Sequence, residues 1–139
     1  MAPGGRTPLY IGLHVRRTDY IAFSKKVLGK KVASKAFYME AMDYFEEEYA
    51  EHHVIFLAVS DDLEWVRREL GGRRNLVLAG THGKGEQGGL DSVGVDLAIL
   101  AACNHTIISQ GLFGTWGAFL AGGDVYSTYG VMVRDVLSL

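Results

Sequence analysis

The feature that most constrains the fold of this chain is a regular alternation of short apolar runs with longer segments of helical periodicity. Five runs rich in Val, Ile and Leu have the length of strands: 9–15, 54–60, 75–80, 105–110 and 124–128. Four segments between them have the length and spacing of helices: 34–52, 62–70, 93–104 and 113–123. Strands that are apolar along their whole length are typical of a parallel sheet with helices on both faces. The order therefore predicts a single α/β domain with a doubly wound, mostly parallel, Rossmann-like sheet.

The helical segments carry the signals expected at a helix start and on a buried face. In the first segment Phe37 and Phe45 fall on one face, with acidic residues on the other. Ser34 and Asp62 stand where they can cap the first and second helices. We expect Trp65 and Trp116 to belong to the core.

Composition excludes several classes of function. The 139 residues have a net charge of −2, with no basic stretch suited to nucleic acid. Neither a membrane-spanning apolar run nor a signal-peptide core is present in the sequence. The single cysteine, Cys103, lies in an apolar stretch, which predicts a buried structural thiol.

Polar and glycine-rich sequences follow four of the predicted strands. The first strand runs into HVRRTD, the second into SDD, the third into GTHGKGEQGG and the fourth into SQGLFGTW. In a doubly wound sheet, ligands bind outside the carboxyl ends of the strands, near the point where the strand order reverses. These four strand ends therefore predict one ligand site on one rim of the sheet.

The first strand end has the composition of an anion site. Side chains alternate along a strand, so His14 and Arg16 face one way while Val15 and Arg17 face the other. One arginine can offer its planar fork to a phosphate while the other pairs with Asp19. The helix that starts after the fourth strand adds backbone N–H groups, and the two elements together suit a pyrophosphate. The alternatives are a surface arginine pair with a weak Asp19 salt bridge, and a structural role for His14.

Two blocks of the sequence resemble a known enzyme family. IGLHVRRTDY resembles the His-x-Arg-Arg-x-Asp motif of fucosyltransferases that use GDP-fucose, in the form typical of the galactoside α-1,2-fucosyltransferases. DLAILAACNHTIISQGLFGTWGAFLAGGDVYSTYG resembles the remaining motifs of that family, in the same order. With FYMEAMDYF and VSDDLEWVRREL between them, the resemblance covers nearly the whole chain.

The resemblance implies a GT-B glycosyltransferase, in which two Rossmann-like lobes face each other across a cleft. Residues 9–139 would form the lobe that binds GDP-fucose. By similarity Arg16 contacts the diphosphate, His14 lies close to the donor, and Arg17 and Asp19 support that strand end. Arg16 and His14 are accordingly the expected catalytic residues.

The second block supplies the remaining donor-binding residues by similarity. Asp96 is expected to bind guanine, with a helix-start charge as the alternative. The turn at Gly111, Leu112 and Phe113 is expected to receive the phosphates through backbone amides. Leu112 stands where family members commonly carry Ser or Thr, and loss of that hydroxyl would cost about 0.5–1.5 kcal/mol of donor binding.

The implied reaction is an inverting transfer of L-fucose from GDP-fucose to the 2-hydroxyl of a terminal galactose on a glycan. No cofactor or metal is expected, because Asp61 and Asp62 are adjacent and do not form the Asp-x-Asp motif of metal-dependent glycosyltransferases. We expect these two residues to form a loop and a helix cap. The general base is left open among His14, Asp19 and His82.

Relatives of this kind also have an acceptor lobe, a stem and a membrane anchor, which have no counterpart in the sequence. We therefore expect a soluble fragment of an enzyme of the Golgi membrane, facing the lumen. A nucleotide-binding module without turnover is the alternative, and a hydrolase that uses His14 and Asp19 is a more remote one.

Overall fold

The computed structural model describes residues 5–17, 33–79, 89–109, 112–128 and 130–132. Within these ranges the helices and strands follow the order β1 (Pro8–Val15), α2 (Lys35–Glu48), β2 (His53–Ser60), α3 (Leu63–Leu70), β3 (Leu76–Leu78), α4 (Gly89–Ala101), β4 (His105–Ile108), α5 (Leu112–Ala121), β5 (Val125–Ser127) and β6 (Gly130–Met132). The predicted alternation of strands and helices is confirmed.

The strands form one six-stranded sheet in the order β3-β2-β1-β4-β5-β6. The first five strands are parallel to their neighbours, and β6 runs antiparallel to β5. The chain starts at the central strand β1, builds outward through β2 and β3, and then crosses to β4 on the other side of β1. The strand order therefore reverses between β1 and β4, which is the position where ligands bind in such sheets.

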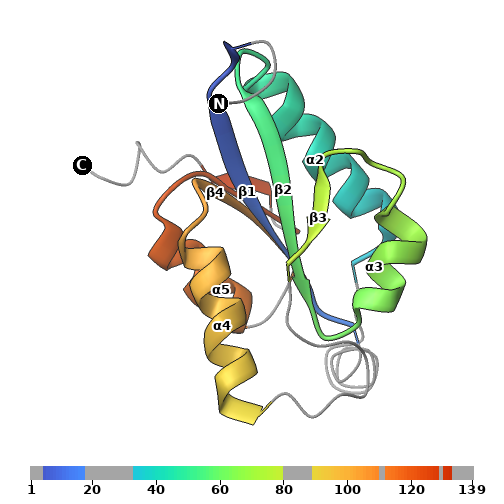
Figure 1. Cartoon of the computed structure of the whole chain (residues 1–139), viewed down its shortest axis with the longest axis vertical. Coiled ribbons are helices and arrows are strands. Elements are labelled where there is room, and N and C mark those ends of the chain that lie inside the picture. The colour runs from blue at the N-terminus through green and yellow to red at the C-terminus, as the bar shows by residue number, and fades with distance from the viewer. Residues whose placement is uncertain (1–4, 18–32, 80–88, 110–111, 129, 133–139) are drawn as a thin grey trace.

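Helices cover both faces of the sheet, as Figure 1 shows, with α2 and α3 on one face and α4 and α5 on the other. Alternate residues of β1 separate the two layers. Ile11 and Val15 belong to the core cluster that includes Phe45 of α2. Gly12 faces the opposite layer, where the position of its missing Cβ lies 2.9 Å from Leu100 of α4. The doubly wound α/β prediction is therefore confirmed.

Both predicted helix caps are present. The Ser34 Oγ accepts a hydrogen bond from the Phe37 N–H at 3.2 Å, and the Asp62 Oδ1 accepts one from the Trp65 N–H at 3.2 Å. These side chains satisfy backbone donors that a helix start leaves without an intrahelical partner.

The prediction for the two tryptophans is half right. Trp65 is 8% exposed and belongs to the core, but Trp116 is 56% exposed. The reason is the inward face of α5, which is made of small residues, Gly114, Gly117 and Ala118, that allow the helix to approach β4 and α4 closely. Trp116 consequently lies on the outer face of α5.

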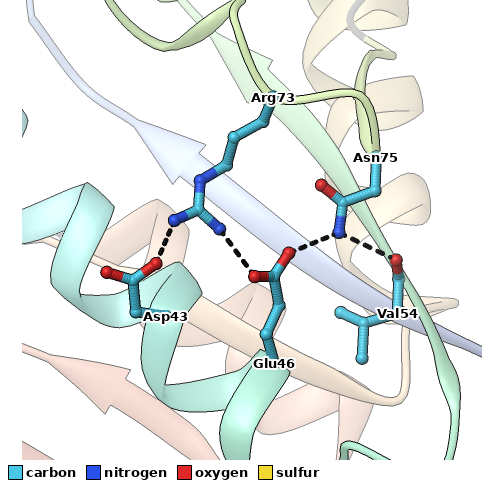
Figure 2. Close-up of polar contacts among 5 residues, drawn as sticks. All are labelled: Asp43, Glu46, Val54, Arg73 and Asn75. Carbon is cyan, nitrogen blue, oxygen red and sulfur yellow. Dashed lines mark hydrogen bonds and ion pairs between the residues drawn. The ribbon is translucent and has the colours of Figure 1, made fainter.

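A polar cluster at the amino rim of the sheet joins α2 to the segment that leads into β3 (Figure 2). The guanidinium of Arg73 forms ion pairs with Asp43 and, at 3.2 Å, with Glu46. Asn75 Nδ2 donates to the other carboxylate oxygen of Glu46 at 2.7 Å and to the carbonyl of Val54 at 3.0 Å. The cluster fixes the entry of β3 against β2 at the rim opposite the predicted ligand site.

No helix in the described part of the chain is long and apolar enough to cross a membrane.

Candidate functional site

The candidate site lies at the carboxyl end of β1, beside the reversal of strand order. The parallel register places His14 next to Ile108 of β4 and Val15 next to Ser60 of β2. The ends of the first, second and fourth strands therefore meet on one rim, as the sequence predicted. Residues 80–88 and 110–111, which include His82 and Gly111, lie outside the described residues.

His14 is buried beneath the first turns of α5. It is 5% exposed, and an added Cβ on Gly114 would lie 2.9 Å from its Nδ1. Burial lowers the pKa of His14 from 6.5 to about 4; the Asp61 carboxylate opposes this effect and the Arg16 guanidinium adds to it. The ring is therefore neutral at physiological pH and a weak base.

Arg17 lies on the side of the strand that the periodicity predicts, whereas the direction of Arg16 stays a prediction. Arg16 acts on the charge of His14, which faces α5. The Arg17 guanidinium lies on the other side of the strand, 4.1 Å above the ring of Trp65 in α3. The pairing of Arg17 with Asp19 stays a prediction, because Asp19 lies outside the described residues. Arg17 is thus placed against α3, while Arg16 helps to lower the pKa of His14.

The Ser-Asp-Asp sequence after β2 fastens the end of β1. Ser60 Oγ donates to the carbonyl of Val15 at 2.6 Å and accepts from the Asp62 N–H at 2.9 Å. Asp61 Oδ1 accepts from the Arg17 N–H at 2.8 Å. The predicted loop and helix cap are confirmed. The sequence analysis did not predict the contact of Asp61 with Arg17. Pairing the first predicted strand with the second would have brought these two strand ends together and indicated it.

The start of α5 supplies the second anion-binding element at the same rim. The helix begins at Leu112, four residues after β4 ends at Ile108, so the backbone of Leu112 and Phe113 belongs to its first turn. The N–H groups of a helix start have no intrahelical partner and carry partial positive charge. His14 lies against this helix at Gly114, so the start of α5 and the end of β1 are neighbours.

Asp96 lies in the interior of α4 and is 7% exposed. The alternative of a helix-start charge is wrong, because α4 begins at Gly89, two turns earlier. Asp96 precedes Leu100 by one turn and shares its face, which contacts Gly12 of β1 and Gly117 of α5. A carboxylate this deeply buried is uncommon in proteins, which keeps Asp96 as a candidate site residue.

The single cysteine has structural surroundings. Cys103 is 4% exposed, its Sγ donates to the carbonyl of Ile99 at 3.2 Å, and burial raises its pKa to about 11. The predicted structural thiol is confirmed. Among the residues that the structure describes, no three His, Cys, Asp or Glu side chains are grouped so that they could hold a metal ion.

Comparison with known proteins identifies relatives over most of the chain. Residues 2–131 match the family described as glycosyl transferase family 11. The galactoside 2-alpha-L-fucosyltransferase SEC1 of Bos taurus is 39% identical over 121 residues, which cover 86% of this chain and 31% of that protein. The galactoside 2-alpha-L-fucosyltransferase Sec1 of Mus musculus is 38% identical over 121 residues, covering 87% and 31%. The chain thus spans about a third of the length of these relatives.

A solved structure shows the same fold. The fucosyltransferase NodZ from Bradyrhizobium superposes with a TM-score of 0.57 at 15% sequence identity, covering 91% of this chain and 41% of that one. The likeness extends over nearly all of this chain.

Proposed function

The chain belongs to glycosyl transferase family 11, and on that premise we propose that it is the nucleotide-sugar lobe of a GT-B galactoside α-1,2-fucosyltransferase. The reaction would transfer L-fucose from GDP-fucose to the 2-hydroxyl of a terminal galactose on a glycan, with inversion. The observation that carries this proposal is the packing of the end of β1, which bears His14 and leads into Arg16, against the start of α5 beside the reversal of strand order.

The diphosphate of GDP-fucose fits this pair of elements. When the bond between fucose and the diphosphate breaks, negative charge builds on the diphosphate oxygens while positive charge builds on the sugar. A guanidinium and preorganised N–H groups that face those oxygens bind them more tightly as the charge grows, and this differential binding lowers the barrier. Arg16 would supply the charge, and the backbone of Leu112 and Phe113, with Gly111, would supply the N–H groups.

Asp96 is the residue that we assign to guanine. A carboxylate can accept hydrogen bonds from both N1–H and the exocyclic amine of guanine, whereas adenine offers no such pair of donors. Its position on the inner face of α4 supports this role, because the surrounding core would fix its direction.

We assign His14 to the lining of the donor site as a neutral ring. A base with a pKa of about 4 is too weak to remove a proton efficiently from a sugar hydroxyl at neutral pH. The same property argues against the hydrolase alternative, which needs His14 as a base. The proton of the acceptor hydroxyl would therefore pass to another group, for which Asp19 and His82 remain candidates.

The transfer would proceed without a metal ion. The two carboxylates after β2 both have local partners, since Asp61 accepts from Arg17 and Asp62 caps α3. Because each carboxylate has a partner of its own, the pair is not arranged to chelate one cation together. Arg16 would then neutralise the negative charge on the leaving diphosphate. We further propose a Golgi lumenal location, as the resemblance implies.

A second candidate is a nucleotide-binding module without turnover, favoured by the observation that the chain spans about a third of its relatives' length. An assay with GDP-fucose and a galactose-terminated acceptor separates the two. Fucosylated product together with released GDP would establish the transferase. GDP binding without product would support the module, and GDP release without acceptor would indicate a hydrolase instead.

A further inference from the structure

The two residues that flank Arg16 are both tied to the end of β2. On one side, the carbonyl of Val15 accepts the 2.6 Å hydrogen bond from Ser60 Oγ. On the other, the N–H of Arg17 donates the 2.8 Å hydrogen bond to Asp61 Oδ1. The backbone from which Arg16 projects is therefore held at both ends by one short segment.

The side chain of Arg17 adds a third tie, on the side of β1 that packs against α3. Its guanidinium lies 4.1 Å from the centre of the Trp65 ring, which is the geometry of a cation–π contact. Such a contact gains strength where water is excluded, and Trp65 is only 8% exposed.

The Trp65 ring is a fixed platform. The backbone N–H of Trp65 donates to Asp62 Oδ1 at the start of α3, and the Trp65 ring packs edge-on against Tyr38 of α2 at a centroid distance of 6.1 Å. Since the platform cannot shift easily, Arg17 is held where it is. The function proposed above gives no role to Trp65.

We propose that Trp65 and Asp61 are positioning residues of the donor site, which hold Arg17 against α3 so that Arg16 is presented to the diphosphate from a fixed backbone. This inference rests on the proposed function. It assigns Arg17 a role that acts through Arg16, without contact with the donor.

A double-mutant cycle on GDP affinity tests the inference. We expect Trp65→Leu and Arg17→Ala each to weaken GDP binding about fivefold, the size of one partly desolvated cation–π contact. The double variant should lose no more than either single variant, because both remove the same contact. Trp65→Phe keeps a ring face and should retain an intermediate affinity.

The second tie has its own conservative variant. Asp61→Asn keeps an oxygen that can accept from the Arg17 N–H and should bind GDP nearly as the unaltered chain does. Asp61→Ala removes that acceptor and should weaken binding severalfold. A rescue of this kind identifies the hydrogen bond, since loss of charge is common to both variants.

Arg73→Ala is the matched control, because it also removes a cation with structural contacts but lies at the opposite rim. Thermal unfolding of every variant separates stability from affinity. Should Trp65→Leu fail to fold, the comparison of Trp65→Phe, Asp61→Asn and Asp61→Ala still decides.

Four results would overturn the inference. If Arg17→Ala loses tenfold or more while folded Trp65 variants bind normally, Arg17 touches the donor directly. If Arg73→Ala loses as much affinity as Trp65→Leu, the effect is one of general stability. If the unaltered chain binds no GDP, the proposed function fails and this inference fails with it. If the unaltered chain and all Trp65 and Asp61 variants bind GDP normally, this inference alone is wrong.

Discussion

The burial of His14 affects both the candidate site, where the ring is neutral, and the pH dependence of folding stability. Its folded pKa of about 4 lies below the 6.5 of an exposed histidine, because burial disfavours the charged ring. Between these two values the unfolded chain binds the proton and the folded chain does not. Stability that is present above pH 6.5 is therefore lost as the pH falls through this window.

The corresponding prediction is a pH-dependent loss of up to about 3 kcal/mol of unfolding free energy between pH 6.5 and pH 4 that His14→Gln abolishes. Denaturant unfolding across this range measures it, with the variant and the unaltered chain compared at each pH. Equal slopes for the two chains would show that His14 does not titrate in this way.

At the scale of single residues, the sequence predicted directions better than partners. The period of two along a strand was enough to predict that His14 faces one layer, while Arg17 faces the other with Val15. The Trp65 partner of Arg17 could not be predicted, because it depends on the register of β1 with β2 and on the angle at which α3 leaves the sheet. The burial of His14 likewise depends on the close approach of α5 at Gly114.

Two glycines on α5 place this helix against its neighbours in different ways. A Cβ on Gly114 would lie 2.9 Å from His14 and 3.2 Å from Ile108, whereas a Cβ on Gly117 would lie 2.8 Å from Leu100 of α4. The first glycine therefore sets the distance of α5 from the end of β1, and the second sets its distance from α4.

We predict that Gly114→Ala and Gly117→Ala both destabilise the lobe, by about 1–2 kcal/mol, as overpacking exceeds the gain in helix propensity. Only Gly114→Ala should also weaken GDP binding, because it moves the start of α5 at the site. Chemical denaturation and GDP titration measure the two effects. Gly94→Ala in α4 is the control: its Cβ would meet nothing within 4 Å, so it should stabilise by about 0.5–1 kcal/mol. Equal GDP affinities for the two α5 variants would contradict the role of Gly114.

At the scale of elements, the sequence predicted every strand and helix of the described chain except β6. That strand has three exposed residues, Gly130–Met132, and lacks the apolar run that marks the others. Gly130, with a φ of 115°, begins it in a conformation that residues with a side chain rarely adopt. Short exposed edge strands carry no burial pattern, so periodicity could not detect it.

In the whole molecule, the proposed donor site and a stabilising polar cluster lie at opposite rims of the sheet. The donor site proposed above lies at the carboxyl ends of the parallel strands, and the Arg73 cluster lies at their amino ends. Alternation of strands and helices predicted the parallel sheet, but not that β4 returns to the far side of β1. The crossover determines where the strand order reverses, and it depends on long-range packing that local sequence does not encode.

We predict that Arg73→Ala lowers the unfolding free energy by about 1 kcal/mol without changing GDP affinity. The loss is modest because the carboxylates of Asp43 and Glu46 are well exposed to solvent. Thermal unfolding and GDP titration on the same preparation measure both quantities. If GDP affinity falls by more than the loss of folded protein can explain, the two rims are coupled.

The central claim is that Arg16 binds the diphosphate of GDP-fucose at the reversal of strand order. Calorimetric titration of the purified chain with GDP and GDP-fucose, without metal, tests it most directly, with Arg16→Ala beside the unaltered chain. Arg67→Ala, which removes an exposed arginine of α3, is the control for loss of a positive charge. We expect saturable binding that Arg16→Ala weakens more than about tenfold, or about 1.4 kcal/mol, and that Arg67→Ala leaves unchanged. Equal affinities for Arg16→Ala and the unaltered chain, or no binding by either, would contradict the claim.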